Sequence, residues 1–94
     1  MITKFGSLFA GHVDLDNLGF QGTPTNDRFY SNEYLATVYD KTQAVAQLMD
    51  RSGYDTFWMA EHHFQPEGFE CIPNLMLLNV HLAHLTQRIK FVCV

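Results

Sequence analysis

The segment of residues 57–64 constrains the fold of this chain more than any other. It runs Phe-Trp-Met-Ala and then changes at once to Glu-His-His-Phe, so an apolar stretch ends in a carboxylate and two adjacent imidazoles. A continuous apolar run is typical of a buried strand in a parallel sheet, and in α/β folds the groups that act on ligands follow the carboxyl end of the strand. The segment therefore predicts a strand over residues 56–60 that places Glu61 and His62 at its end.

One helix is expected before this strand in the sequence and one after it. The first begins at an N-cap on Ser31 or Asn32 and ends at a left-handed cap on Gly53. Its apolar positions recur at spacings of three and four residues, at Leu35, Val38, Thr42, Val45 and Met49. The second, over residues 74–87, is apolar almost all round, so we expect it to pack on a sheet and against a neighbour as well. Pro73 is expected to open it.

Two further apolar segments predict strands at residues 5–10 and 89–94, the first of them buried. Gly6 in the first indicates close approach of a neighbouring backbone. The order strand, helix, strand, helix, strand predicts parallel crossovers and an α/β fold. Three such strands with helices on one face leave apolar surface uncovered, and the sequence stops inside the last strand. We therefore expect residues 1–94 to be the N-terminal three strands and two helices of a single, incomplete (β/α)8 TIM-type barrel.

Residues 11–32 form a polar segment rich in glycine, with Phe20, Phe29 and Tyr30 among its few aromatics. Connections of this length are uncommon in compact domains unless they serve a function, and the aromatics favour a packed loop. Within it, His12, Asp14 and Asp16 are expected to be solvated turn residues. His12 also follows a strand end, which keeps it a candidate for substrate contact.

Composition limits the function classes. Six Lys and Arg against ten Asp and Glu give a net charge of −4 without charge blocks, which favours neither nucleic acid nor an anionic membrane as a partner. The chain contains no 18-residue apolar run and no signal-peptide core, so we expect a cytoplasmic protein without a membrane span. Cys71 and Cys93 are expected to be free thiols, the first a passive loop residue and the second buried and inert. Three methionines are expected to fill the core: Met49, Met59 and Met76.

Three stretches together carry a resemblance to a known family. They are Lys-Phe-Gly at residues 4–6, the run from Gly53 through the Glu-His-His-Phe tetrad at residues 61–64, and Thr-Gln-Arg-Ile-Lys-Phe at residues 86–91. This pattern resembles the N-terminal region of the bacterial luciferase-like flavin monooxygenases and covers most of the chain. The loop at about residues 11–32 is longer than in the luciferase α subunit and is interpreted as an insertion that affects substrate specificity.

The resemblance implies a flavin-dependent monooxygenase with a TIM-type barrel. Such an enzyme takes reduced FMN from a separate NAD(P)H-dependent flavin reductase and uses molecular oxygen to oxidise an aldehyde or another small organic substrate. It also implies a homodimer or heterodimer. Because the family's flavin phosphate site lies on later strands, residues 1–94 alone should bind FMN weakly or not at all and be inactive.

The resemblance also assigns roles to single residues. The family's catalytic histidine aligns with His62, and imidazoles exchange protons near neutral pH, so we expect acid–base work there. Glu61 is expected either to orient that imidazole or to face the flavin edge, and the small Ala60 to let the isoalloxazine approach. His63 is expected to be structural. The ends of the strands at residues 5–10 and 91–94 should line the same pocket.

Several alternatives stay open at this point. A deazaflavin-dependent oxidoreductase or a non-catalytic flavin-binding relative would share the fold, and the Glu-His-His cluster could be an ordinary polar strand end. His81 and His84 could join His62, His63 or Cys71 around a metal. We expect no metal, because no His-Glu-x-x-His pattern is present and outward-facing helix residues lie far from the mouth of a barrel.

Overall fold

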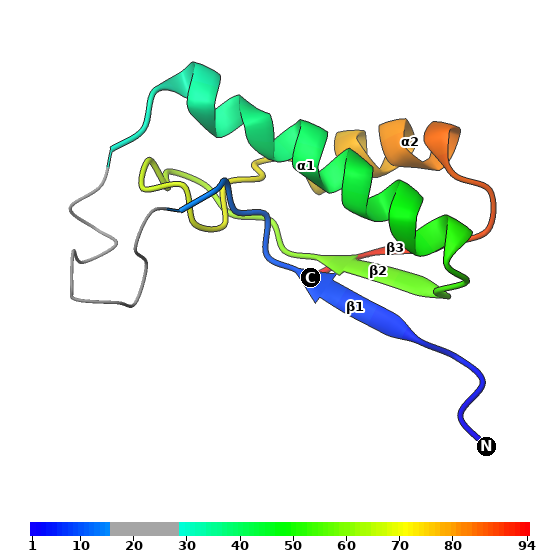
Figure 1. The fold of residues 1–94 in the computed structure, drawn as a ribbon. Helices are drawn as coiled ribbons and strands as arrows, with labels where there is room; N and C mark the ends of the chain where they lie inside the picture. The colour runs from blue at the N-terminus through cyan, green and yellow to red at the C-terminus, as the bar shows by residue number, and fades with distance from the viewer. Residues whose placement is uncertain (16–28) are drawn as a thin grey trace.

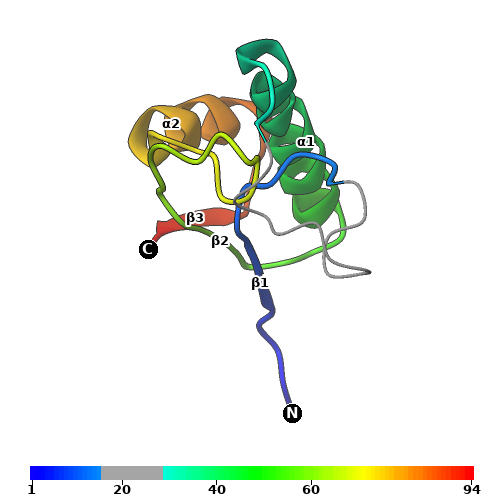
Figure 2. The same ribbon diagram turned by 90° about the vertical axis from the view of Figure 1, so that its left-hand side faces the viewer.

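The computed structural model describes residues 1–15 and 29–94. Its elements are β1 (Gly6–Phe9), α1 (Asn32–Arg51), β2 (Thr56–Met59), α2 (Leu75–Leu85) and β3 (Lys90–Cys93). The strands form one parallel sheet in the order β1-β2-β3, and both helices lie on the same side of it (Figures 1 and 2). The predicted α/β arrangement of three parallel strands and two helices is thereby confirmed. The strands are one or two residues shorter than predicted.

Helix α1 has the boundaries that its local sequence predicts. The Ser31 hydroxyl accepts a hydrogen bond from the Tyr34 N–H at 3.2 Å, so Ser31 is the N-cap. Glu33 lies in the first turn, where its own backbone N–H and then the Ser31 hydroxyl lower the pKa of its carboxyl. Gly53, with φ of +85°, follows the last turn, and the Tyr54 N–H donates to the Met49 carbonyl at 3.0 Å. Both predicted caps are therefore confirmed.

Helix α2 is shorter than the predicted 74–87. Asn74 caps it through the Leu77 N–H at 3.0 Å, so Pro73 precedes the cap instead of opening the first turn. Thr86 is already extended. The helix buries one side through Leu75, Leu78 and Leu82, while Met76, Leu77 and Val80 stay exposed. The prediction that Met76 fills the core is wrong, because it lies on the face of α2 turned away from the sheet. In the described part of the chain, neither helix is both long and apolar enough to span a membrane.

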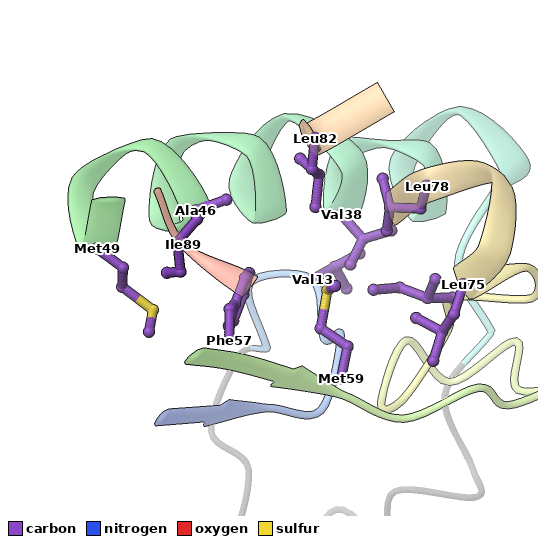
Figure 3. Packing of buried hydrophobic residues seen from close by; sticks show 11 residues of the cluster. Val13, Val38, Ala46, Met49, Phe57, Met59, Leu75, Leu78, Leu82 and Ile89 are labelled. Carbon is purple, nitrogen blue, oxygen red and sulfur yellow. The ribbon is translucent and has the colours of Figure 1, made fainter. Parts of the chain in front are cut away.

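The core fills the layer between the helices and the sheet (Figure 3). Phe57 and Met59 rise into it from β2 and are fully buried. The Phe57 ring lies between Phe9 and Phe91 of the neighbouring strands, at centroid distances of 6.3 and 6.2 Å. The other buried apolar members are Val13, Val38, Ala46, Met49, Ile72, Leu75, Leu78, Leu82 and Ile89. One compact apolar layer therefore fixes the position of β2 beneath both helices.

The opposite face of the sheet is open. Leu8 of β1 is 64% exposed and Trp58 of β2 is 40% exposed, so the prediction of buried strands is wrong for this face within the described residues. The cause is that helices cover only one face, which confirms the expected uncovered surface. Gly6 permits close pairing, since a Cβ there would clash with the Thr56 Oγ1. Cys93 is exposed and its sulfur accepts a hydrogen bond from Asn79, contrary to the predicted burial.

Candidate active site

At the end of β2, the alternation of side chains along the strand determines the face of the sheet on which each residue lies. The ladder continues beyond Met59, because the Val94 N–H donates to the Met59 carbonyl at 2.9 Å and the Glu61 N–H to the Val94 carbonyl at 3.2 Å. Alternation along this ladder places Ala60 on the open face with Trp58, and Glu61 on the side of the helices. The chain then folds back, and the His62 N–H donates to the Ile72 carbonyl at 3.0 Å.

His62 is half-buried and its two ring nitrogens have different surroundings. Nε2 lies 3.2 Å from Oε2 of Glu70. Nδ1 has less than 1 Å² of accessible surface and no hydrogen-bond partner among the described residues. A buried polar atom without a partner is uncommon in native structures and often marks a position that a ligand or water satisfies. The predicted catalytic histidine therefore has one paired nitrogen and one buried nitrogen without a partner among the described residues.

A hollow of about 480 Å³ adjoins His62. Its walls come from the start of α1 and from the segment between β2 and α2, and they are mostly apolar: Asn32, Leu35, His62, Phe64, Gln65, Pro66, Cys71 and Pro73. Neither β1 nor β3 contributes to this hollow, and the lining of the flavin pocket by their ends stays a prediction. The segment after His62 folds back beside the carboxyl end of β2 and supplies most of the walls of the hollow.

The carboxylate of Glu61 binds both the start of α2 and the second histidine, His63. Its Oε2 accepts the Leu75 N–H at 3.0 Å, and its Oε1 lies 3.2 Å from Nε2 of His63. These interactions, the Leu75 N–H first and His63 second, lower the pKa of the Glu61 carboxyl. The expectation that Glu61 orients His62 is wrong, because Glu61 lies on the helix side of the strand. A contact of Glu61 or Ala60 with a flavin stays a prediction, as does the structural role of His63.

The end of β1 forms a second hollow, of about 360 Å³, lined by His12, Asp14, Leu15, Lys41 and Phe69. Lys41 Nζ lies 2.7 Å from Asp14 Oδ1 and 3.4 Å from His12 Nδ1. The Lys41 ammonium lowers the pKa of the Asp14 carboxyl by hydrogen bonding and by charge. Asp14 itself is largely exposed, as expected for a loop residue. Asp16, the third residue of the predicted group, lies outside the described residues.

The remaining candidates do not gather around a metal. Residues 1–15 and 29–94 contain no group of three His, Cys, Asp or Glu side chains that could hold one. His81 Nε2 on α2 lies 3.0 Å from Oε1 of Gln43 on α1, so His81 contacts the other helix. Cys71 donates to the Gly11 carbonyl at 3.2 Å, and burial raises the pKa of its thiol. Cys71 is therefore held as a neutral thiol, in line with the passive role predicted for it.

Sequence reasoning missed Glu70, the one carboxylate that meets His62 within residues 1–15 and 29–94. Glu70 lies eight positions further along the chain, inside a segment predicted only as a loop. No periodicity relates the two residues, and Glu70 reaches His62 through a left-handed backbone with φ of +60°. The only available signal was an acidic residue in the same connection as the histidine pair.

Family comparison assigns the chain. The family model described as luciferase-like monooxygenase matches residues 5–93. The chain belongs to this family. Among curated relatives, the uncharacterized protein y4vJ of Sinorhizobium fredii is 36% identical over 62 residues, which are 63% of this chain and 17% of that protein. The uncharacterized protein YwcH of Bacillus subtilis is 35% identical over 54 residues, 57% of this chain and 16% of the relative.

Two solved structures share the fold of this luciferase-like chain. The oxygenating constituent of 3,6-diketocamphane monooxygenase from Pseudomonas putida, a type II Baeyer-Villiger monooxygenase in complex with FMN, has a TM-score of 0.69 and 26% identity. That match covers 99% of this chain and 21% of the other. Apo-MsnO8 has a TM-score of 0.66 and 25% identity, over 94% of this chain and 21% of that one. The chain thus spans about a fifth of the length of the proteins it matches.

The residues at the end of β2 are compatible with the apolar ring of a flavin and not with its phosphate. Ala60 presents a small side chain on the open face, and the separate hollow beside His62 is mostly apolar. The described walls of that hollow contain neither Lys nor Arg, the side chains that usually bind a phosphate. Among the described residues, those at the end of β2 can therefore hold only part of FMN.

Proposed function

We propose that the protein acts as a flavin-dependent monooxygenase that uses reduced FMN and molecular oxygen to oxidise a small organic substrate. Membership of the luciferase-like family and similarity to an FMN-bound monooxygenase support this function. The observation that carries it is the buried Nδ1 of His62 at the carboxyl end of β2, which has no hydrogen-bond partner among the described residues. In the proposed enzyme, these residues are the first part of a complete (β/α)8 barrel, and the phosphate is bound by strands that this chain does not contain.

The roles proposed for individual residues follow from their positions. His62 takes or returns a proton at Nδ1, which is shielded from bulk water. Leu35, Phe64 and Pro73 line the adjoining hollow and offer apolar surface to a substrate. Ala60 leaves room for a flat ring on the open face. Bound reduced FMN would supply the electrons that activate oxygen.

A histidine substitution tests the catalytic role directly. In the protein expressed from its complete gene, with chemically reduced FMN, oxygen and a panel of aldehydes and cyclic ketones, we expect substrate-dependent oxidation. His62→Ala should lower turnover by about 10²-fold or more, because it removes the group that transfers the proton. His63→Ala is the matched control, since it removes an adjacent imidazole that is bound to Glu61. Full turnover by His62→Ala would exclude His62 from the chemistry.

The choice of cofactor separates the remaining functions on the same fold. We expect FMN to bind more tightly than a deazaflavin in an equilibrium titration of the complete gene product, and turnover with FMN to consume oxygen. Tighter deazaflavin binding with hydride transfer would replace the monooxygenase proposal. Flavin binding without oxygen consumption on any substrate would indicate a non-catalytic relative. Activity with chemically reduced FMN alone would support a reductase that acts separately.

A further inference from the structure

We infer that Glu70 is a positioning residue that fixes the ring and the tautomer of His62, an inference that rests on the proposed function. The two residues form a carboxylate–imidazole pair, with Glu70 Oε2 3.2 Å from His62 Nε2. Both side chains are about one-third exposed, at 29% for Glu70 and 33% for His62, and of the two only His62 lines the hollow. Glu61 cannot take this role because it binds His63 and the Leu75 N–H.

The backbone around Glu70 is held in place independently of His62. On one side the Val13 N–H donates to the Gly68 carbonyl at 3.0 Å, and on the other the Cys71 N–H donates to the Gly11 carbonyl at 2.8 Å. These bonds attach the loop to the end of β1. Between them, Glu70 adopts φ of +60°, a conformation that is unfavourable for any residue with a β-carbon. Such strain persists where the surroundings enforce it, and it commonly accompanies a functional constraint.

The pairing has a definite chemical consequence. An ionised carboxylate only accepts hydrogen bonds, so a neutral His62 facing Glu70 carries its proton on Nε2. Nδ1 is then the unprotonated nitrogen, and it is the buried atom without a partner. Glu70 therefore presents Nδ1 as the proton acceptor, while the bond from the His62 N–H to the Ile72 carbonyl fixes the backbone. An orienting carboxylate of this kind acts through the imidazole and need not touch the substrate.

The test uses the complete gene product and two substitutions of Glu70. Glu70→Gln removes the charge, and its amide can either donate or accept, so both tautomers become possible. Glu70→Gly removes the side chain and suits a positive φ. We expect kcat to fall by roughly 10-fold or more in both variants with little change in KM. We also expect the Nε2–H proton resonance of His62, assigned by its absence in His62→Gln, to be present in the wild type and lost in both variants.

Stability and matched controls separate positioning from a structural role. Glu70→Gly should melt at the same or a higher temperature than the wild type, whereas a merely structural carboxylate would lower the melting temperature on removal. Glu67→Gln removes the same charge from the same loop and should leave kcat and the His62 resonance unchanged. Retention of the Nε2–H resonance in Glu70→Gln and Glu70→Gly would overturn the inference. Because the resonance needs no turnover, an inactive wild type would contradict only the proposed function.

Discussion

The two adjacent histidines differ because each has its own carboxylate. His62 pairs with Glu70 from the following loop, and His63 pairs with Glu61 of the same strand end. Strand alternation separates the two pairs, since Glu61 and His63 lie two positions apart and so share a side. One pair adjoins the hollow, and the other is attached to the first residue of α2. The two neighbouring histidines therefore have distinct surroundings: His62 lies beside the hollow, and His63 is paired with the carboxylate that binds the start of α2.

Two glycines should resist substitution for different reasons. A Cβ on Gly6 would clash with the Thr56 Oγ1, which also accepts the Trp58 Nε1–H at 3.0 Å. Gly53 has open space around it but a φ of +85°. Gly6→Ala should lower the free energy of unfolding by about 1–3 kcal/mol through crowding, and Gly53→Ala by about 1 kcal/mol through backbone strain.

Chemical denaturation of the complete gene product measures both glycine effects. Gly53→Asn is the informative control, because asparagine tolerates the left-handed region better than alanine does. It should retain more stability than Gly53→Ala. At Gly6, where φ is not positive, asparagine should be at least as damaging as alanine. Equal losses for Asn and Ala at Gly53 would contradict the explanation by backbone strain.

At the scale of elements, Asp50 joins α1 to the connection between α2 and β3. Its carboxylate accepts three consecutive backbone N–H groups, from Gln87 at 3.0 Å and from Arg88 and Ile89 at 2.9 Å each. These bonds, those from Ile89 and Arg88 first, lower the pKa of Asp50. They also explain where α2 ends, because backbone groups beyond Thr86 bind α1 instead of continuing the helix. The last turn of α1 thereby sets the start of β3.

Asp50 should make the free energy of unfolding depend on pH in the acidic range. A carboxyl whose pKa is lowered by folding stabilises the native state above its ordinary pKa and loses that contribution as the pH falls through the lowered value. We expect Asp50→Asn to be less stable than the wild type at pH 7, and the difference to shrink as the pH drops below about 4. Urea melts at several pH values measure it. Asp40→Asn, on the same helix, is the control and should show no such convergence, whereas a constant difference for Asp50→Asn would contradict this role.

The elements were predictable from sequence where the determining contacts are local. Ser31 and Gly53 act within one turn of the helix ends, and the spacing of Val38, Thr42 and Met49 specifies the buried side of α1. The end of α2 was not predictable, because it depends on Asp50 at a separation of 37 to 39 residues. Exposure of Met76 and Cys93 was missed because apolar composition does not specify which side of an element is covered.

The candidate site divides in the same way. The position of His62 after β2 followed from the apolar run that precedes it, and the hollow now adjoins that residue. Glu70 was missed because a left-handed residue between long-range backbone bonds leaves no pattern in the sequence. The predicted partner of Glu61 was wrong for a related reason, since the face of the sheet on which Glu61 lies depends on the pairing of the end of β2 with Val94.

At the scale of the whole molecule, the described residues form two layers, and the face of the sheet that the helices leave uncovered is apolar. Leu8 and Trp58 project from that face. Large exposed apolar surfaces drive association. The residues on the helix side already have their core, so the open face is the surface through which these 94 residues should meet further protein.

The single tryptophan allows this expectation to be measured. When the 94-residue polypeptide is prepared alone, Trp58 emission should shift to shorter wavelength as the concentration rises, because association buries the open face. Leu8→Glu should suppress the shift by placing a charge on that face. Val80→Glu, on the exposed side of α2, is the matched control and should leave the shift unchanged. An identical response of both variants would place the association elsewhere.

The backbone bonds between the two loops have a consequence for how such a protein can diverge. The segments on either side of residues 16–28 are each attached to the loop that follows β2, through Val13 to Gly68 and through Tyr30 to Pro66. Insertions or deletions between these two anchors need not displace the histidine, because both anchors bind the loop that carries Glu70. Lineages could therefore exchange that stretch to reach new substrates while keeping the same proton-transfer group. The two backbone hydrogen bonds then separate the segment that varies from the residues proposed for the chemistry.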